Sequence, residues 1–262
     1  MSRNSYILSS KQGRRYQLGG CIISDKPSDA SKYGAVRTVA SKDLPPVVDL
    51  RALMTPVEEQ LETLAWYKIR FDFILRKKKL FCHYFSVPNA LAGAYEFLIM
   101  KDTRKHIDVS RLFIYYNARR IGGLQDYNMQ DTGTQIKNGI ESLVVFGCCK
   151  ESLLPYKIEL INQVPSKECY EDAKHYRIAS SMSIDVKLDE MKACLAEGFP
   201  FIFGLELFQS FENAETNGGH VPMPENNEQE AASHRFHAML AVGYIEPWKC
   251  FIVRNSWGPD WV

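Results

Sequence analysis

The spacing of apolar and polar positions divides the chain into a mainly helical first half and a mainly β second half. Three stretches combine helix-forming residues with apolar positions at helical spacing, and Gly147 follows the last of them as a C-terminal cap. They cover residues 89–100, 110–119 and 134–146. Three later runs, 200–207, 238–244 and 250–254, are short, apolar and separated by Gly, Pro and Asn clusters, as strands are. The pattern therefore predicts the α+β fold class.

Residues 1–44 have a different character, because they are rich in Ser, Lys, Asp and Gly and contain few apolar repeats. We expect an extended N-terminal arm there, with ordered structure beginning at Pro45 and Pro46. The first 17 residues are polar and basic and lack the apolar stretch of roughly 7–15 residues found in secretory signals. No run of about 18 apolar residues predicts a transmembrane segment. The compartment is left open by the sequence, which shows no signal peptide: a cytoplasmic location fits it, and so does a lysosome-like compartment if an upstream exon is missing.

The composition is that of a globular protein, with 45% hydrophobic and 24% charged residues in a chain of 262. Lys and Arg number 32 against 31 Asp and Glu, so no global field favours nucleic acid as a partner. Seven cysteines at irregular spacing indicate neither a dense disulfide framework nor a paired zinc motif. The sequence does not decide whether one disulfide forms among Cys169, Cys194 and Cys250. Because the number of cysteines is odd, at least one thiol must be free of intrachain bridges.

Two segments near the end of the chain carry the residue types of nucleophilic catalysis, which needs a nucleophile, a base and a group that orients the base. His237 begins one apolar run, and Asn255-Ser256-Trp257-Gly258 follows the next. A histidine at the start of a strand can bond the Asn255 side chain on a neighbouring strand, with Trp257 shielding the bond from water. Each segment alone fits a buried histidine or a plain turn equally well. The two together, in this order, favour a catalytic pair.

These segments resemble the histidine and asparagine motifs of the papain-like cysteine peptidases, in particular members with a short pro-region. The sequence Pro-Pro-Val-Val-Asp-Leu-Arg at 45–51 resembles the start of the family's mature domain, and the segment 56–60 resembles the one that ends in the oxyanion-binding glutamine, here Gln60. Residues 89–96 resemble the central helix. The resemblance implies a papain-like two-lobe fold, with a helical lobe near 45–160, a β-rich lobe near 161–262 and a substrate cleft between them.

The same alignment places Ser86 where the family has its nucleophilic cysteine. A serine hydroxyl ionises far above the thiol reference pKa of about 8.5, so an ion pair with His237 cannot form in advance. We therefore expect impaired catalysis. Silicateins also carry serine at this position, but their surrounding Gly and Ser pattern is absent here. Cys82, one helical turn earlier, could supply a displaced thiolate, although a small buried side chain explains it better.

Residues 61–85 match no expected element of the family and mix basic with aromatic side chains. We expect a poorly packed excursion, which is either a true insertion or an error in the gene model; a membrane or polyanion contact is less favoured. The chain also stops at 257–262, where the family continues into another strand, which suggests truncation. Residues 16–29 resemble the start of a short pro-region that could occupy the cleft, and a disordered tail fits them equally well.

The resemblance implies hydrolysis of peptide bonds through an acyl-enzyme. Ser86 would attack, His237 would transfer the proton, Asn255 would orient the ring and Gln60 would bind the oxyanion. It implies peptide or protein substrates, a monomer, and neither a metal nor an organic cofactor. The alternative is a noncatalytic pseudoprotease that keeps the cleft as a peptide-binding or regulatory module.

Overall fold

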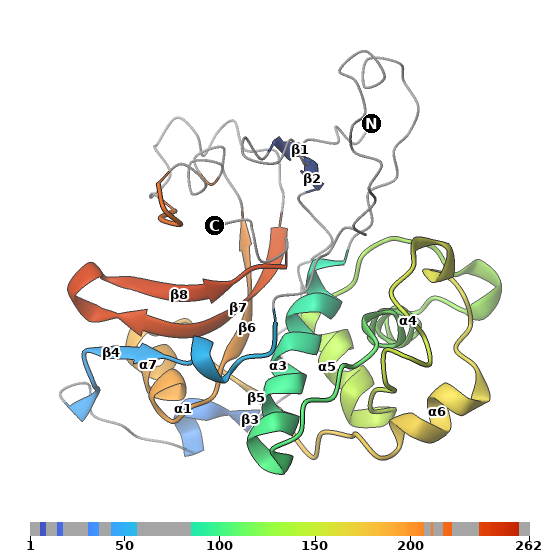
Figure 1. Ribbon diagram of the computed structural model, residues 1–262, viewed down its shortest axis with the longest axis horizontal. Coiled ribbons are helices and arrows are strands. Elements are labelled where there is room, and N and C mark those ends of the chain that lie inside the picture. The colour runs from blue at the N-terminus through green and yellow to red at the C-terminus, as the bar shows by residue number, and fades with distance from the viewer. Residues whose placement is uncertain are drawn as a thin grey trace.

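The computed structural model describes residues 6–8, 15–17, 31–36, 43–56, 85–206, 211, 217–221 and 236–256. Helices lie on one side of the molecule and a four-stranded sheet on the other, with one long helix between them (Figure 1). The helix between them is α3 (Ser86–Thr103), and the helices on the first side include α4 (Arg111–Ile121), α5 (Ile136–Val145) and α6 (Lys167–Ala173). The sheet contains β4 (Val47–Asp49), β6 (Phe201–Glu206), β7 (Phe236–Ile245) and β8 (Cys250–Arg254). This is the predicted α+β fold.

The central helix α3 begins three residues before the predicted stretch and is buried along most of its length. Pro88 falls in its first turn, where a missing backbone N–H costs nothing. Small residues such as Ala90, Ala92 and Ala94 let α4, α5 and β7 approach closely. A helix that is apolar nearly all round needs partners on every side, and α3 has them in both halves of the molecule.

The ends of the next two helices follow from local sequence. The Ser110 hydroxyl accepts a hydrogen bond from the Phe113 N–H at 3.1 Å, which caps α4. Helix α5 is shorter than the predicted 134–146, and Gly147 follows it with a φ of +79°. The Gly147 N–H bonds the Leu143 carbonyl at 3.1 Å, so the predicted glycine cap is confirmed.

Strand β7 is the centre of the sheet and pairs antiparallel with β4, β6 and β8. The three strands predicted from sequence are confirmed within two residues at each end. Strand β4 lies far from β7 in the sequence: its residue Val47 pairs with Ile245, 198 positions later. A side chain at Gly243 would collide with the Val48 carbonyl at 2.2 Å, so glycine is required for this pairing.

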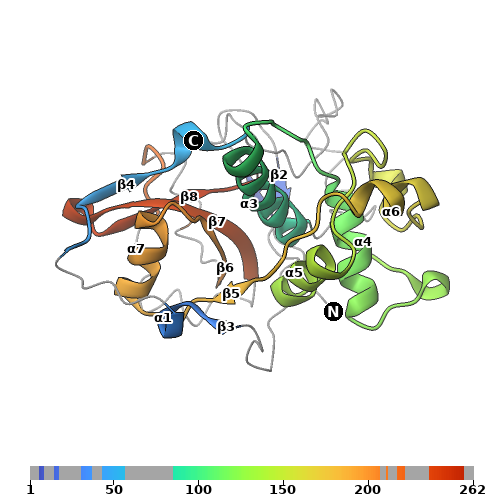
Figure 2. The same cartoon turned by 90° about the horizontal axis from the view of Figure 1, so that it is seen from below.

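Two segments cross the lobe limits expected from sequence. Strand β4 belongs to the sheet although it precedes the helical part, and Cys169 and Ala173 of α6 pack in the helical core although they follow residue 160. Helix α7 (Leu188–Ala196) lies beside the sheet, near α1 (Tyr33–Val36) (Figure 2). The paired dipeptides β3 (Ser31–Lys32) and β5 (Met182–Ser183) lie next to it.

Part of the expected N-terminal arm is packed against the rest of the chain. Tyr33 is buried against Ala193 and Cys194 of α7, and Lys32 forms an ion pair with Asp185 at 2.9 Å. Further upstream, β1 (Tyr6–Leu8) and β2 (Arg15–Gln17) pair antiparallel. Short 3-10 turns complete the secondary structure at Arg51–Leu53, Asp126–Asn128, Ile158–Leu160 and Glu246–Trp248.

The expected excursion at 61–85 lies outside the described residues except for its last position. There the expectation is wrong, because Phe85 is a core residue that is 1% exposed. Its ring centroid lies 4.6 Å from that of Tyr115 and 5.0 Å from that of Tyr156. The family-like packing therefore begins at least one residue before Ser86.

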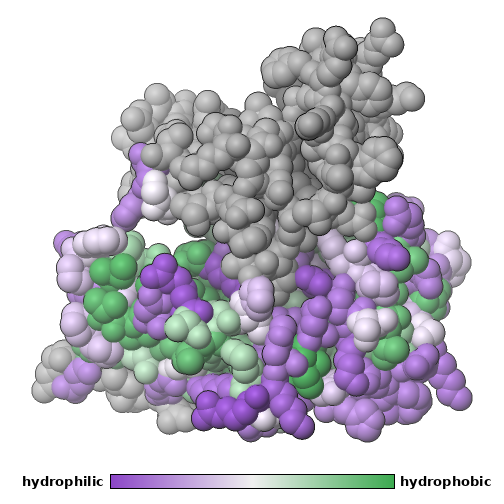
Figure 3. Space-filling model, in the orientation of Figure 1, coloured by the Kyte–Doolittle hydropathy of each residue, from purple (hydrophilic) through white to green (hydrophobic). Residues whose placement is uncertain are grey.

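The surface of the described residues is mixed in character. Figure 3 shows hydrophobic side chains over the sheet on the left and mainly hydrophilic ones at the lower right. Val47 of β4 and Val253 of β8 are among the large apolar residues that remain exposed. Within the described part of the chain, no helix combines the length and apolar character needed to cross a membrane.

Candidate active site

His237 and Asn255 are in direct contact, as their motifs predicted. His237 lies on β7, and Asn255 follows the last residue of β8, the neighbouring strand. The His237 Nε2 and the Asn255 Oδ1 are 2.8 Å apart. The same oxygen accepts a second hydrogen bond from the Ser256 N–H at 2.9 Å, which fixes the amide orientation. The asparagine is therefore held as an acceptor facing the ring.

Burial determines the protonation state of this histidine. His237 is 0% exposed, and burial lowers its pKa to about 4, against the opposing effect of the hydrogen bond to Asn255. The ring is consequently neutral at pH 7. Because Nε2 donates its proton to Asn255, Nδ1 carries the lone pair in this tautomer. The arrangement can accept a proton at Nδ1, as a general base must.

Ser86 is the first residue of α3 and is 0% exposed. The N-terminus of an 18-residue helix carries a partial positive charge, which stabilises a negative charge on a side chain there. Phe85 and Val87, on either side of Ser86, belong to the same hydrophobic cluster as Ala238, the residue after His237. This packing brings the start of α3 against the start of β7. Ser86 thus lies at the interface of the two elements that carry the predicted nucleophile and base.

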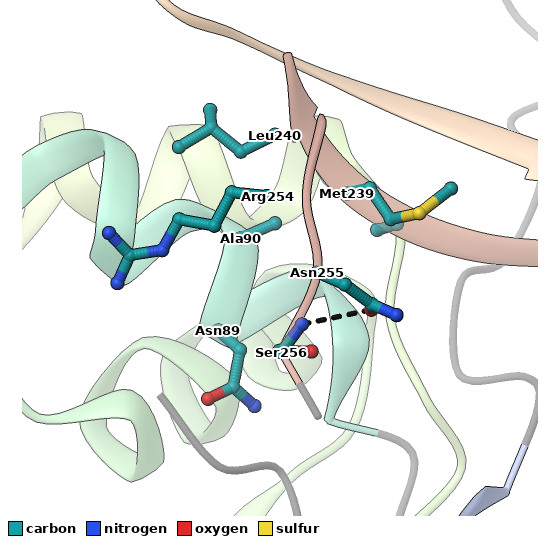
Figure 4. A pocket seen from close by; sticks show the side chains of 8 residues that line it. Asn89, Ala90, Met239, Leu240, Arg254, Asn255 and Ser256 are labelled. Atoms are coloured by element: carbon teal, nitrogen blue, oxygen red, sulfur yellow. Dashed lines mark hydrogen bonds between the residues drawn. The ribbon is translucent and has the colours of Figure 1, made fainter. Parts of the chain in front are cut away.

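A small cavity of about 10 Å³ lies where the first turn of α3 meets β7 and the end of β8 (Figure 4). Its lining includes Asn89, Met239, Arg254, Asn255 and Ser256. Two polar atoms near it, Asn89 Oδ1 and Asn255 Nδ2, are buried without a hydrogen-bond partner in the described structure. This volume is about that of one water molecule, so the cavity does not admit a substrate side chain.

The described cysteines offer no alternative nucleophile beside His237. Cys148, Cys149 and Cys194 are buried, and burial raises the pKa of each thiol, that of Cys194 to about 12. The bridge left open among Cys169, Cys194 and Cys250 is absent, because all three are free thiols. In the described ranges, no group of three or more His, Cys, Asp or Glu side chains could hold a metal ion. Gln60, Cys82 and Trp257 lie outside those ranges.

Sequence reasoning missed one residue of the site region, Arg254. Its side chain is only 8% exposed, and it bonds the main chain at Thr55 and Pro56. A charged residue at the end of an apolar run, directly before Asn255, was the available signal. Its partners, 199 and 198 positions away, could not be inferred from that signal.

No family model matches the chain. In sequence it is similar to an uncharacterized peptidase C1-like protein of Acanthamoeba polyphaga mimivirus, with 38% identity over 183 residues. The match takes in 66% of this chain and 57% of the viral protein, so the chain spans just over half the length of that relative.

Solved structures are similar over more of the chain. Xylellain, a cysteine protease from Xylella fastidiosa, superposes with a TM-score of 0.72 and 30% identity, over 94% of this chain and 87% of xylellain. Digestive procathepsin L 3 of Tenebrio molitor larval midgut gives a TM-score of 0.56 at 16% identity, over 88% of this chain and 66% of that protein. The second similarity concerns the fold alone.

Proposed function

Because the chain belongs to the papain-like cysteine peptidase family, we propose that it binds peptides with the family's hydrolytic arrangement but cleaves them poorly. The observation that carries the proposal is the contact between His237 and Asn255, at 2.8 Å, next to the helix that begins with Ser86. A buried, neutral histidine whose ring is held in one orientation can act as a general base. The Ser86 hydroxyl, unlike a thiol, does not ionise readily near pH 7.

The proposed reaction uses the residues in the roles that the family alignment gives them. The Ser86 hydroxyl attacks the peptide carbonyl while His237 Nδ1 accepts its proton. Asn255 holds the ring in the productive orientation, and Gln60 donates to the oxyanion. His237 then returns the proton to the leaving amine, and a water molecule, activated by the same ring, releases the acyl group from Ser86.

Two properties of the described residues support weak catalysis. A pKa of about 4 makes His237 a poor base for a hydroxyl, whose own pKa lies far above that of a thiol. Ser86 is also fully buried, so a peptide carbonyl reaches its oxygen only after neighbouring groups move. A thiolate at this position would lessen the first difficulty, because its charge favours the protonated ring.

The test is the substitution Ser86→Cys, assayed with fluorogenic peptide substrates and a thiol-directed peptidyl epoxide. The protein as it stands should cleave at background level and resist the epoxide. The variant should gain cleavage and be labelled at residue 86, and His237→Ala in the same background should abolish both. Circular dichroism must show that all three proteins are folded.

A folded Ser86→Cys variant that stays inert would favour the noncatalytic alternative, a pseudoprotease that binds peptides. The full burial of Ser86 supports this noncatalytic alternative. Activity of the parent chain that survives Ser86→Ala but vanishes with Cys82→Ala would instead move the nucleophile to Cys82. The N-terminal arm is a second candidate occupant of the cleft, which inhibition of the Ser86→Cys variant by a synthetic peptide of residues 1–30 would reveal.

A further inference from the structure

A buried guanidinium joins the end of β8 to a distant part of the chain. Arg254 Nη1 donates to the Thr55 carbonyl at 2.7 Å and to the Thr55 hydroxyl at 3.3 Å, and Nη2 donates to the Pro56 carbonyl. The planar guanidinium presents its N–H groups in a rigid fork. Bonds to two consecutive carbonyls therefore fix both the position and the direction of the main chain at Thr55 and Pro56.

The same guanidinium lies against the central helix. A Cβ atom added to Gly93 would sit 3.3 Å from both Cζ and Nε of Arg254. Gly93 lies two turns after Ser86 on α3, and a larger residue would press on the arginine from the helix side. Glycine thus allows the side chain to pass close to the helix on its way to Thr55.

These contacts link three segments that carry predicted catalytic groups or, in the case of Thr55 and Pro56, precede one in the sequence. Asn255 follows Arg254 directly, and Figure 4 shows the two side chains leaving the strand in different directions. Ser86 begins the helix that Arg254 touches at Gly93. Gln60 follows Pro56 by four positions in the sequence. One side chain is therefore bonded to, or packed on, all three segments.

We propose that Arg254 is a positioning residue for peptide hydrolysis, which ties the end of β8, and with it Asn255, to α3 and to the main chain at Thr55 and Pro56. This inference rests on the proposed function, because it assigns a role within that reaction. Loss of the guanidinium removes its bonds to the Thr55 and Pro56 carbonyls and its packing on α3, and so loosens the strand end from which Asn255 orients the His237 ring. The ring orientation matters during proton transfer, so the turnover number suffers more than substrate binding does.

The experiment uses the Ser86→Cys protein as parent and compares Arg254→Ala, Arg254→Lys and Arg119→Ala. Arg119 is the matched control, since it is 2% exposed and also bonds main-chain carbonyls, those of Gln130 and Ile161, but within the helical part. Both alanine variants should lower Tm. Only Arg254→Ala should lower kcat, by about 10- to 100-fold with KM changed less than about twofold, since small misplacements cost about that much. Arg254→Lys should recover part of the loss.

Hydrogen exchange supplies a second measurement. Deuterium uptake of a peptide covering residues 51–60 should rise in Arg254→Ala and stay at the parent level in Arg119→Ala. A kcat within about twofold of the parent, unchanged uptake, or an equal loss of kcat in both alanine variants would overturn the role of Arg254. An inactive Ser86→Cys parent would overturn the proposed function and this role together, whereas an active parent with an unaffected Arg254→Ala would overturn this role alone.

Discussion

His237 shows how much of the candidate site local sequence can predict. The histidine and Asn255 each stand at the edge of an apolar run, and two antiparallel strands bring such edges together. Their contact was therefore predictable from pattern and order. Arg254 was not, because the carbonyls of Thr55 and Pro56 that bind it belong to a turn with no hydrophobic signal of its own.

The burial of His237 makes stability depend on pH. Its folded pKa of about 4 lies below the ordinary value of 6.5, so the unfolded chain binds more protons between these limits. The contribution of neutral His237 to the free energy of unfolding is fully present above pH 6.5. It decreases as the pH drops towards 4, by up to about 3 kcal/mol. Urea unfolding at several pH values should show a shallower acid loss in His237→Gln than in the parent.

The exposed His175 supplies the control, since His175→Gln should keep the parent's acid dependence. Equal slopes for the parent and His237→Gln would mean that this histidine is not buried in its neutral form.

At the scale of elements, the helices and strands with strong apolar periodicity were predicted within a few residues. Helix α3 was predicted to begin at Asn89 but begins at Ser86, because Pro88 reads as a boundary when seen alone and is harmless in a first turn. The short helices α6 and α7 were not predicted. Their positions depend on tertiary packing, as with Cys169 in the helical core and Leu195 beside the sheet.

Ser110 offers a test of how the element that packs on α3 is held. Its hydroxyl caps α4 through the Phe113 N–H and also donates to the buried Leu154 carbonyl at 2.7 Å. Ser110→Ala removes both bonds and should cost about 2 kcal/mol of unfolding free energy. Ser166→Ala is the comparison, since Ser166 caps the short helix α6 through a 3.3 Å bond and lies nearer the surface.

Chemical denaturation of the two serine variants measures the loss of unfolding free energy in each. The larger loss should belong to Ser110→Ala, and a loss below about 0.5 kcal/mol for that variant would show that neither bond stabilises the fold.

At the scale of the whole molecule, the two-lobe interpretation foresaw the arrangement of helices and sheet but not how the halves are joined. Strand β4 precedes the main helices in the sequence, whereas β6, β7 and β8 follow them, so the sheet joins segments from both sides of the helical part. Pairing across about 200 positions leaves no local trace in the sequence beyond two adjacent valines in the three-residue strand β4. Gly243 is needed because a side chain there would collide with β4, and this reason becomes visible only when the position of β4 is known.

The packing of Tyr33 on α7 is also a contact between distant parts of the sequence that local pattern does not predict. Tyr33 is a single aromatic residue within a polar stretch, and the neighbouring sequence does not predict that it packs against Ala193 and Cys194. Composition favoured an extended arm, whereas the burial of Tyr33, the ion pair of Lys32 with Asp185 and the pairing of β3 with β5 anchor this part of it.

The central claim is that residue 86 occupies the nucleophile position opposite His237, and the pH dependence of alkylation in Ser86→Cys tests it most directly. The rate of iodoacetamide reaction at residue 86 would be followed by mass spectrometry, with the buried thiols of Cys148, Cys149 and Cys194 as unreactive internal references. The account predicts a half-maximal rate well below the ordinary thiol pKa of about 8.5, moving upward when His237→Ala is added. A profile centred at or above about 8.5 that ignores the loss of His237 would contradict it.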